Sequence, residues 1–207
     1  MKSFFTIVPF LFLCQTVLGT AQIPDKILYN KKEYMLQSNP LEVFFEEYPE
    51  KRPKSQVWSN ALYRGYVATF QIRNNQLYVR DIEIIDNTGK SGWKSVKKNI
   101  FPRRRLVKVD WMTGLLVLPS GKLLSYVDRG YASTFERYTV LEINNGTLVS
   151  EKQFEYAEFE IFKEQMFELF KKTEEYQRQK SRLQRNTEWS DDEIDIFLKN
   201  IVLEFSK

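Results

Sequence analysis

The feature that most constrains the fold is a long series of alternating apolar and polar residues, interrupted by short turns. The alternation is clearest on both sides of Asn74-Asn75 and again on both sides of Asn144-Asn145-Gly146. Alternation places successive side chains on opposite faces of a strand, and two such runs joined by a tight turn form a β-hairpin. Sequential hairpins favour an antiparallel meander over a parallel sheet.

We expect about six to eight strands between residues 22 and 155, bounded by turn residues. Four hairpins are predicted from paired apolar runs, over residues 27–36, 66–85, 115–127 and 138–154. In the third of these, Pro119-Ser120-Gly121 is the predicted turn, because Pro and Gly favour turn conformations.

Helical periodicity appears before and after this β region. A helix is expected to begin at Asn39-Pro40 and to end at Pro49. After Tyr156 an apolar stripe follows the helical repeat and needs a sheet to cover it; it comprises Phe159, Phe162, Met166, Leu169, Phe170 and Thr173.

A last helix is predicted to begin after Ser190, which forms a capping box with Glu193, while Trp189 and Ile194 occupy the staple positions. The polar, basic residues 178–186 before it indicate a frayed helix end or a linker. The sequence therefore predicts a single α+β domain over residues 22–207. Residues 22–155 are mainly β, and residues 156–207 are helical. One N-terminal helix and two amphipathic C-terminal helices pack on the antiparallel sheet.

The N-terminus has the order of an export signal. Lys2 is followed by an apolar run from Phe4 to Cys14 and then by small residues at Gly19 and Ala21. The run is shorter than the roughly 20 residues of a membrane-spanning helix. We therefore expect residues 1–21 to be a cleaved signal peptide, with cleavage after Gly19 or, as we favour, after Ala21. The mature protein would be periplasmic or extracellular, with no transmembrane segment.

The sequence has no histidine, and its single cysteine, Cys14, lies inside the predicted signal. Nucleophilic systems that use histidine, typical zinc sites and disulfides are therefore excluded from the mature chain. We expect no metal and no cofactor. The formal net charge of +4 is too small to indicate a nucleic-acid partner.

A seven-residue pattern occurs twice. Residues 64–70 and 129–135 agree at Arg, Gly, Tyr, Thr and Phe, and an Asn-Asn turn follows each copy. One interpretation is a duplicated strand-turn-strand unit; the other is chance convergence of two strands. Arg and Tyr two residues apart share a strand face, so one hypothesis is an anion or carbohydrate surface made by Arg64, Tyr66, Arg129 and Tyr131. The alternative is that the tyrosines are core and the arginines reach out from the sheet rim.

A second candidate binding site is the basic stretch from Lys90 to Lys108, in which aromatic residues are interleaved with cations. It predicts charge-assisted contacts with an anionic glycan, a lipid headgroup or an acidic protein, although a solvated loop between two hairpins is the alternative. The candidate contact residues here are Trp93, Lys97, Lys98, Arg103, Arg104 and Arg105.

Carboxylates are the catalytic groups that remain. A glycoside hydrolase needs only two of them at a suitable separation, which sequence spacing does not report. If the protein is an enzyme, the residues to inspect are Asp110, Asp128 and Glu136.

Four stretches resemble uncharacterised exported bacterial proteins; they lie at residues 111–127, 129–143, 171–176 and 189–198. The resemblance covers most of the mature chain and implies export and a shared fold, but no activity, ligand or catalytic residue. We therefore interpret the protein as an exported, non-catalytic binding module. A carboxylate-based glycan hydrolase and a toxin-neutralising immunity protein remain as alternatives.

Overall fold

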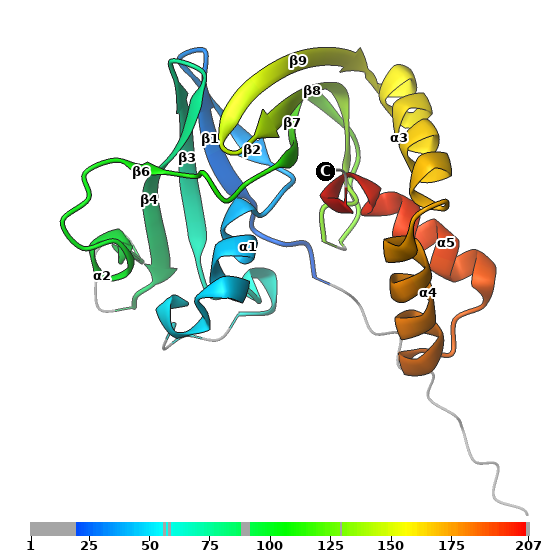
Figure 1. Cartoon of the computed structure of the whole chain (residues 1–207), viewed down its shortest axis with the longest axis horizontal. Helices are drawn as coiled ribbons and strands as arrows, with labels where there is room; N and C mark the ends of the chain where they lie inside the picture. Colours follow the sequence, from blue (N-terminus) through cyan, green and yellow to red (C-terminus); the bar gives the residue numbers. More distant parts are fainter. Residues whose placement is uncertain (1–19, 56, 58, 88–91, 129, 206–207) are drawn as a thin grey trace, which may run out of the picture.

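The structure is a computed structural model that describes residues 20–205, except residues 56, 58, 88–91 and 129. Residues 1–19 of the predicted signal lie outside the described residues. In the described part a sheet of nine strands, mostly antiparallel, is packed against C-terminal helices (Figure 1). The predicted α+β class is confirmed.

The sheet runs in the order β2-β1-β3-β4-β9-β8-β7, with β5 and β6 paired to β4. Neighbours are antiparallel except β1 and β3, which are parallel and place Ile27 opposite Phe70. The sheet curls until its outer strands meet, and the Gln37 N–H donates to the Val117 carbonyl at 3.0 Å. The strands are β1 (Asp25–Tyr29), β2 (Lys32–Leu36), β3 (Val67–Arg73), β4 (Gln76–Ile85), β5 (Trp93–Ser95), β6 (Val107–Lys108), β7 (Gly114–Ser125), β8 (Thr134–Asn144) and β9 (Thr147–Glu155).

The predicted hairpins β3-β4 and β8-β9 are confirmed, and backbone hydrogen bonds connect their two turns. The Leu77 N–H donates to the Gly146 carbonyl at 2.8 Å, and the Leu148 N–H donates to the Asn75 carbonyl at 2.7 Å. Gly146 has a positive φ of 74°, and a Cβ placed there would lie 2.4 Å from the Val109 carbonyl oxygen. The close approach of this turn to the chain after β6 therefore requires glycine at position 146.

The predicted hairpin over residues 115–127 is wrong. β7 is one continuous strand that pairs with β8 along its length. Instead of a turn, its register shifts between Ser120 and Leu123, where Gly121 has a φ of 79°. Pro and Gly signal a β-bulge as well as a turn, and here β8 supplies a partner on both sides of the irregularity.

The helices are α1 (Pro40–Glu47), α2 (Lys97–Ile100), α3 (Tyr156–Phe170), α4 (Glu174–Asn186) and α5 (Asp191–Asn200), with 3-10 turns η1 (Pro49–Lys51), η2 (Asn60–Leu62) and η3 (Val202–Phe205). The predicted N-terminal helix is confirmed as α1, and the Ser190–Glu193 capping box is present at α5. The structure adds α4, where we expected a frayed end or a linker. The Thr173 side chain accepts from the Tyr176 N–H at its start, and Tyr176 is its buried anchor.

Three apolar clusters hold the described part together, and two of them involve the sheet. The main core fills the curled sheet under α1 and includes Leu41, Phe45 and Phe70. The outer face of β7, β8 and β9 packs on α3, where the Tyr138 and Phe159 rings stack with centroids 3.9 Å apart.

The stripe predicted for α3 is partly wrong. Leu169 is 58% exposed, whereas Phe167, which we did not include, is buried with Phe170. The physical reason is that α3 must cover the sheet at its start and meet Tyr176 of α4 and Ile194 of α5 at its end, so its buried face changes along its length.

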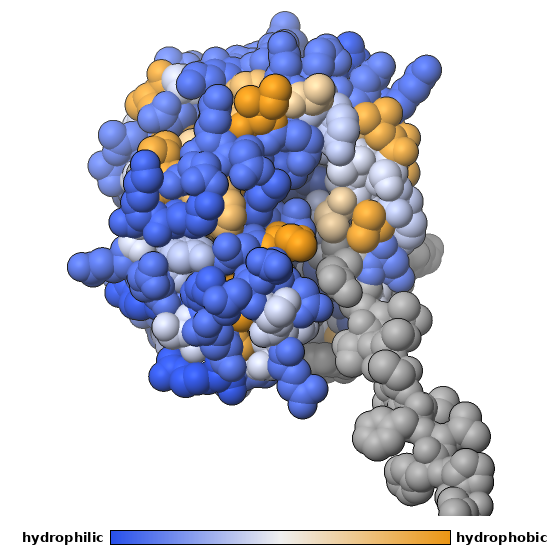
Figure 2. Space-filling model, turned by 90° about the vertical axis from the view of Figure 1, so that its right-hand side faces the viewer, coloured by the Kyte–Doolittle hydropathy of each residue, from blue (hydrophilic) through white to orange (hydrophobic). Residues whose placement is uncertain are grey.

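The side of the molecule that carries α3, α4 and α5 is mainly hydrophilic, and its hydrophobic side chains form separate groups (Figure 2). Across the described residues, no helix combines the length and the apolar character needed to cross a membrane.

Candidate functional site

The best candidate site is the segment from Trp93 to Lys108, which we call the basic segment. It contains seven Lys and Arg residues and no acidic residue, in a chain whose net charge is only +4. The rest of the chain therefore has a net negative charge. The segment lies along β4 where β9 has diverged: Trp93 of β5 pairs with Ile85, and Val107 of β6 pairs with Val79 (Figure 1).

Apolar side chains attach the basic segment to the main core. Val96, Ile100 and Phe101 are buried, and the Phe101 ring stacks on Trp111 with centroids 6.1 Å apart. The Trp111 indole N–H donates to the Pro40 carbonyl at 3.0 Å, which ties this cluster to α1. The aromatic residues interleaved with the cations thus face inward. Trp93 and Trp111 are half-buried and remain partly accessible.

Lys97 is half-buried, and its side chain is hydrogen-bonded to the backbone of the fold. Its ammonium group donates to the Arg80 carbonyl at 3.0 Å and to the Arg105 carbonyl at 2.9 Å. Burial lowers the pKa of Lys97. Of the predicted contact residues, Lys97 is therefore better suited to fix the loop than to meet a partner.

The other cations of the segment are exposed: Lys94, Lys98, Arg103, Arg104, Arg105 and Lys108. None of them forms an ion pair with another described residue. Leu106 follows the three arginines directly, and half of its surface is exposed. The segment therefore presents uncompensated positive charge and one apolar side chain on a loop whose ends are fixed.

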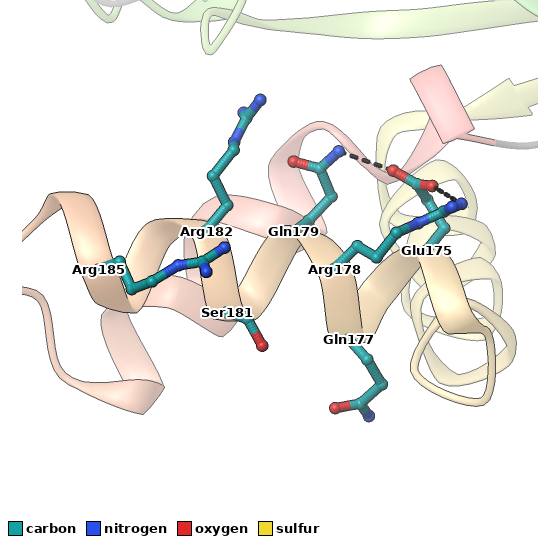
Figure 3. Close-up of a pocket in the computed structure, with 7 residues that line it drawn as sticks. All are labelled: Glu175, Gln177, Arg178, Gln179, Ser181, Arg182 and Arg185. Carbon is teal, nitrogen blue, oxygen red and sulfur yellow. Dashed lines mark hydrogen bonds and ion pairs between the residues drawn. The ribbon is translucent and has the colours of Figure 1, made fainter.

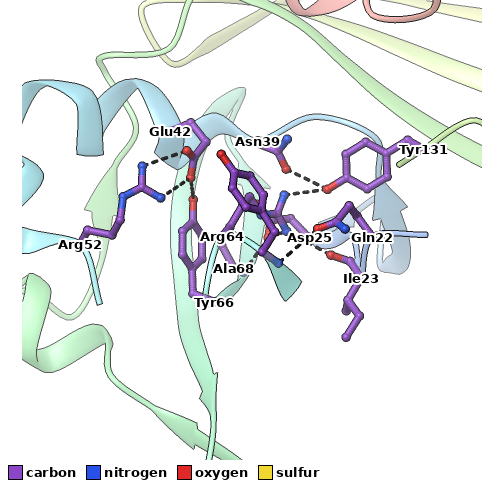
Figure 4. Close-up of polar contacts among 11 residues, drawn as sticks. Gln22, Ile23, Asp25, Asn39, Glu42, Arg52, Arg64, Tyr66, Ala68 and Tyr131 are labelled. Carbon is purple, nitrogen blue, oxygen red and sulfur yellow. Dashed lines mark hydrogen bonds and ion pairs between the residues drawn. The ribbon is translucent and has the colours of Figure 1, made fainter. Parts of the chain in front are cut away.

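Arg64, which we expected on a surface, is instead the centre of a buried polar network (Figure 4). Its guanidinium donates to Asp25 Oδ1 at 3.2 Å, to the Ile23 carbonyl at 3.0 Å and to the Tyr131 hydroxyl at 2.6 Å. The Tyr131 hydroxyl in turn donates to Asn39 Oδ1 at 2.9 Å. The network joins the chain before β1 to the loop before β8.

Tyr66 is also buried, beside this network. Its hydroxyl donates to Glu42 at 2.7 Å, and the Glu42 carboxylate accepts two bonds from Arg52, at 3.0 and 2.9 Å. Burial opposes ionisation of Glu42, but the bonds from Arg52 and Tyr66 outweigh it and lower the pKa of Glu42. For Asp25, burial outweighs the attraction of Arg64 and raises the pKa to about 6.

The hypothesis that Arg64 and Tyr66 line a binding surface is therefore not carried by the structure, since both side chains are inside the fold. Arg129 lies outside the described residues, and Tyr131 is half-buried against Arg64. Sequence reasoning missed Asp25. Its signal was available, because a period of two puts Asp25 on the same face as the buried Ile27 and Tyr29.

The three carboxylates proposed for catalysis lie in two places. Asp110 is exposed in the loop before β7. Asp128 accepts from the Ala21 N–H at 2.7 Å, and Glu136 accepts from the Lys122 N–H at 3.2 Å, so both stabilise backbone near the connection of β7 to β8. Within the described ranges, no group of three or more acidic residues is arranged to hold a metal ion.

Two shallow depressions are present on the described surface. One lies on α4, where Glu175 is held by Arg178 and by Gln179, the latter at 2.7 Å (Figure 3). The other lies beside the β1-β2 turn and has no acidic lining residue. The two together contain a single carboxylate, so neither brings together the pair that glycoside hydrolysis needs.

A scan against protein-family models, a search of curated proteins and a search of solved structures each return no match to this chain. Function is therefore inferred from the surface and its chemistry.

Proposed function

We propose that this protein is an exported binding module that holds an anionic partner on the basic segment and performs no chemistry of its own. One observation carries the proposal: the exposed cations of the segment form no ion pair within the described structure, while Val96, Ile100, Phe101 and Val107 fix the segment to the main core. Guanidinium groups without internal partners are free to bind carboxylate, sulfate or phosphate in bidentate fashion.

The anchoring of the segment matters for affinity. Binding costs free energy when a loop must be ordered at the interface. Here the ordering is largely complete before binding, because Lys97 bonds to the Arg105 carbonyl and Phe101 packs on Trp111. Opposite charge also increases the rate of encounter, and this effect weakens as salt is added.

The test is retention on immobilised heparin, used as a probe of anion binding. We expect the triple variant R103S/R104S/R105S to elute at clearly lower salt than the wild-type protein. The matched control is R178S/R182S/R185S, which removes the same charge from α4 and should elute close to wild type. Both variants are checked for an unchanged thermal transition. Unchanged retention of the first variant would contradict the proposal.

We also infer that the export signal is removed by cleavage after Gly19. The Ala21 N–H bonds to Asp128, and Ala21 forms an isolated bridge with Gly130. Cleavage after Gly19 keeps both contacts, whereas cleavage after Ala21 removes them, so the contacts favour the first site over the one the sequence suggested. The intact mass of the processed protein distinguishes the two.

The internal duplication remains a proposal as well. It is supported by the reciprocal bonds between the turns, from Leu77 to Gly146 and from Leu148 to Asn75. These bonds relate equivalent positions of the two hairpins, as a two-fold repeat would. A profile of related sequences that aligned β3-β4 with β8-β9 would test it.

A further inference from the structure

We infer that the anionic partner is a phospholipid surface, and that Leu106 enters it while Arg103, Arg104 and Arg105 bind its headgroups. This inference rests on the proposed binding function and names the partner. The observation behind it is the exposure of a leucine directly after three exposed arginines.

The position of the loop suits contact with a flat surface. Residues 102–106 join α2 to β6, at the end of the molecule opposite to α3, α4 and α5 (Figure 1). Phe101 is buried immediately before the stretch, and Val107 is buried immediately after Leu106. The Lys97 ammonium also donates to the Arg105 carbonyl at 2.9 Å. Both ends of the exposed stretch are thus fixed, and the four side chains between them are free to meet a membrane.

The pairing of charge with an apolar side chain selects lipid over the other anionic partners. Cations near a membrane gain from the negative surface potential, and an adjacent apolar side chain gains by entering the acyl boundary. A sulfated polysaccharide carries negative charge but has no apolar region in which the Leu106 side chain could be buried. An acidic protein could bury it, and for that reason the test uses lipid with no protein present.

The experiment measures partition of the full processed protein onto phosphatidylcholine vesicles, with or without phosphatidylglycerol. We expect binding only when phosphatidylglycerol is present, and a loss of binding with added salt. R103S/R104S/R105S should lower the partition coefficient about a hundredfold, given the contribution of each cation near an anionic surface. L106S should lower it about tenfold, because part of a leucine side chain is no longer buried.

Two controls separate this inference from the proposed function. L124S removes an equally exposed leucine on β7, which is 52% exposed, and should bind vesicles as wild type does. L106S should elute from heparin at the same salt concentration as wild type, since retention on heparin depends on charge and the substitution leaves the charge unchanged.

The outcomes are distinct. If L106S partitions like wild type, if L124S loses binding instead, or if vesicles without phosphatidylglycerol bind equally well, the lipid inference is wrong. If the protein is then still retained on heparin through the three arginines, the proposed function stands. If neither heparin nor vesicles retain the wild-type protein, both are wrong.

Discussion

The carboxylate of Asp25 and the guanidinium of Arg64 form an ion pair at 3.2 Å in which the side chains are 0% and 5% exposed. Asp25 Oδ1 also accepts from the Ala68 N–H at 2.8 Å. Asp25 Oδ2 and Arg64 Nε have no hydrogen-bond partner in the described structure. Desolvation is therefore incompletely compensated, which is why the pKa of Asp25 rises instead of falling beside its arginine.

The first prediction concerns pH. Because the pKa of Asp25 is about 6 in the folded state against 3.8 ordinarily, the folded state binds the proton more tightly. The contribution of Asp25 to stability is complete below pH 3.8 and is lost as the pH rises through 6. We expect wild type to lose about 2 kcal/mol relative to D25N between pH 4 and pH 7. Urea unfolding at both pH values measures this difference, and parallel curves would contradict it.

The second prediction removes the cation. R64M leaves Asp25 buried without its partner and should lower the free energy of unfolding by about 3 to 5 kcal/mol at pH 7. The loss should be smaller at pH 4, where Asp25 is protonated. R104M, at an exposed position, is the matched control and should change stability by less than about 0.5 kcal/mol.

The third prediction concerns the hydroxyl of Tyr66. Y66F keeps the buried ring but removes the bond to the Glu42 carboxylate, which should cost about 1.5 to 3 kcal/mol because the acceptor is charged. The control is Y63F, since Tyr63 is 72% exposed and should tolerate the same change. Chemical denaturation of the two variants gives the comparison, and equal midpoints would argue against the assigned role.

The fourth prediction concerns the contact between Gly146 and the chain after β6. G146A places a methyl group 2.4 Å from the Val109 carbonyl oxygen at a residue with positive φ. Backbone strain and overpacking together should cost about 2 to 4 kcal/mol. G130A is the control, because Gly130 also has positive φ but has no atom within 4 Å of the added Cβ. If the thermal transition temperature falls equally in G146A and G130A, the loss of stability comes from backbone strain and not from the contact with Val109.

The fifth prediction concerns the start of α5. Ser190 accepts from the Glu193 N–H, and Glu193 accepts from the Ser190 N–H. S190A should therefore cost about 1 kcal/mol. S181A, in the exposed middle of α4, should be neutral or slightly stabilising because alanine favours helix. A loss in S181A as large as that in S190A would remove the capping explanation.

The elements that sequence predicted correctly are those specified by neighbouring residues. The turn residues Asn74-Asn75 and Asn145-Gly146 have positive φ, which Asn tolerates and Gly permits, and the capping box of α5 lies within four residues. Pro119-Ser120-Gly121 was misread because a turn and a bulge share these residues, and pairing with β8 decides between them.

The sequence predicted which residues make up the basic segment, but not which of its side chains point into the core. The run of cations is visible in the sequence, whereas the inward direction of Phe101 depends on Trp111 and Phe44, which lie elsewhere in the chain. The burial of Arg64 depends in the same way on Asp25, on a strand that no local pattern pairs with β3. Long-range pairing of this kind leaves no periodic signal.

The closing contact between Gln37 and Val117 has a consequence for how the chain folds. During synthesis β2 is made before β7, so its outer edge stays unpaired until β7 has been synthesised and has packed beside it. An unpaired strand edge can pair with a strand of another chain. Incomplete chains that lack β7 should therefore tend to self-associate, and this tendency should end once β7 has packed beside β2.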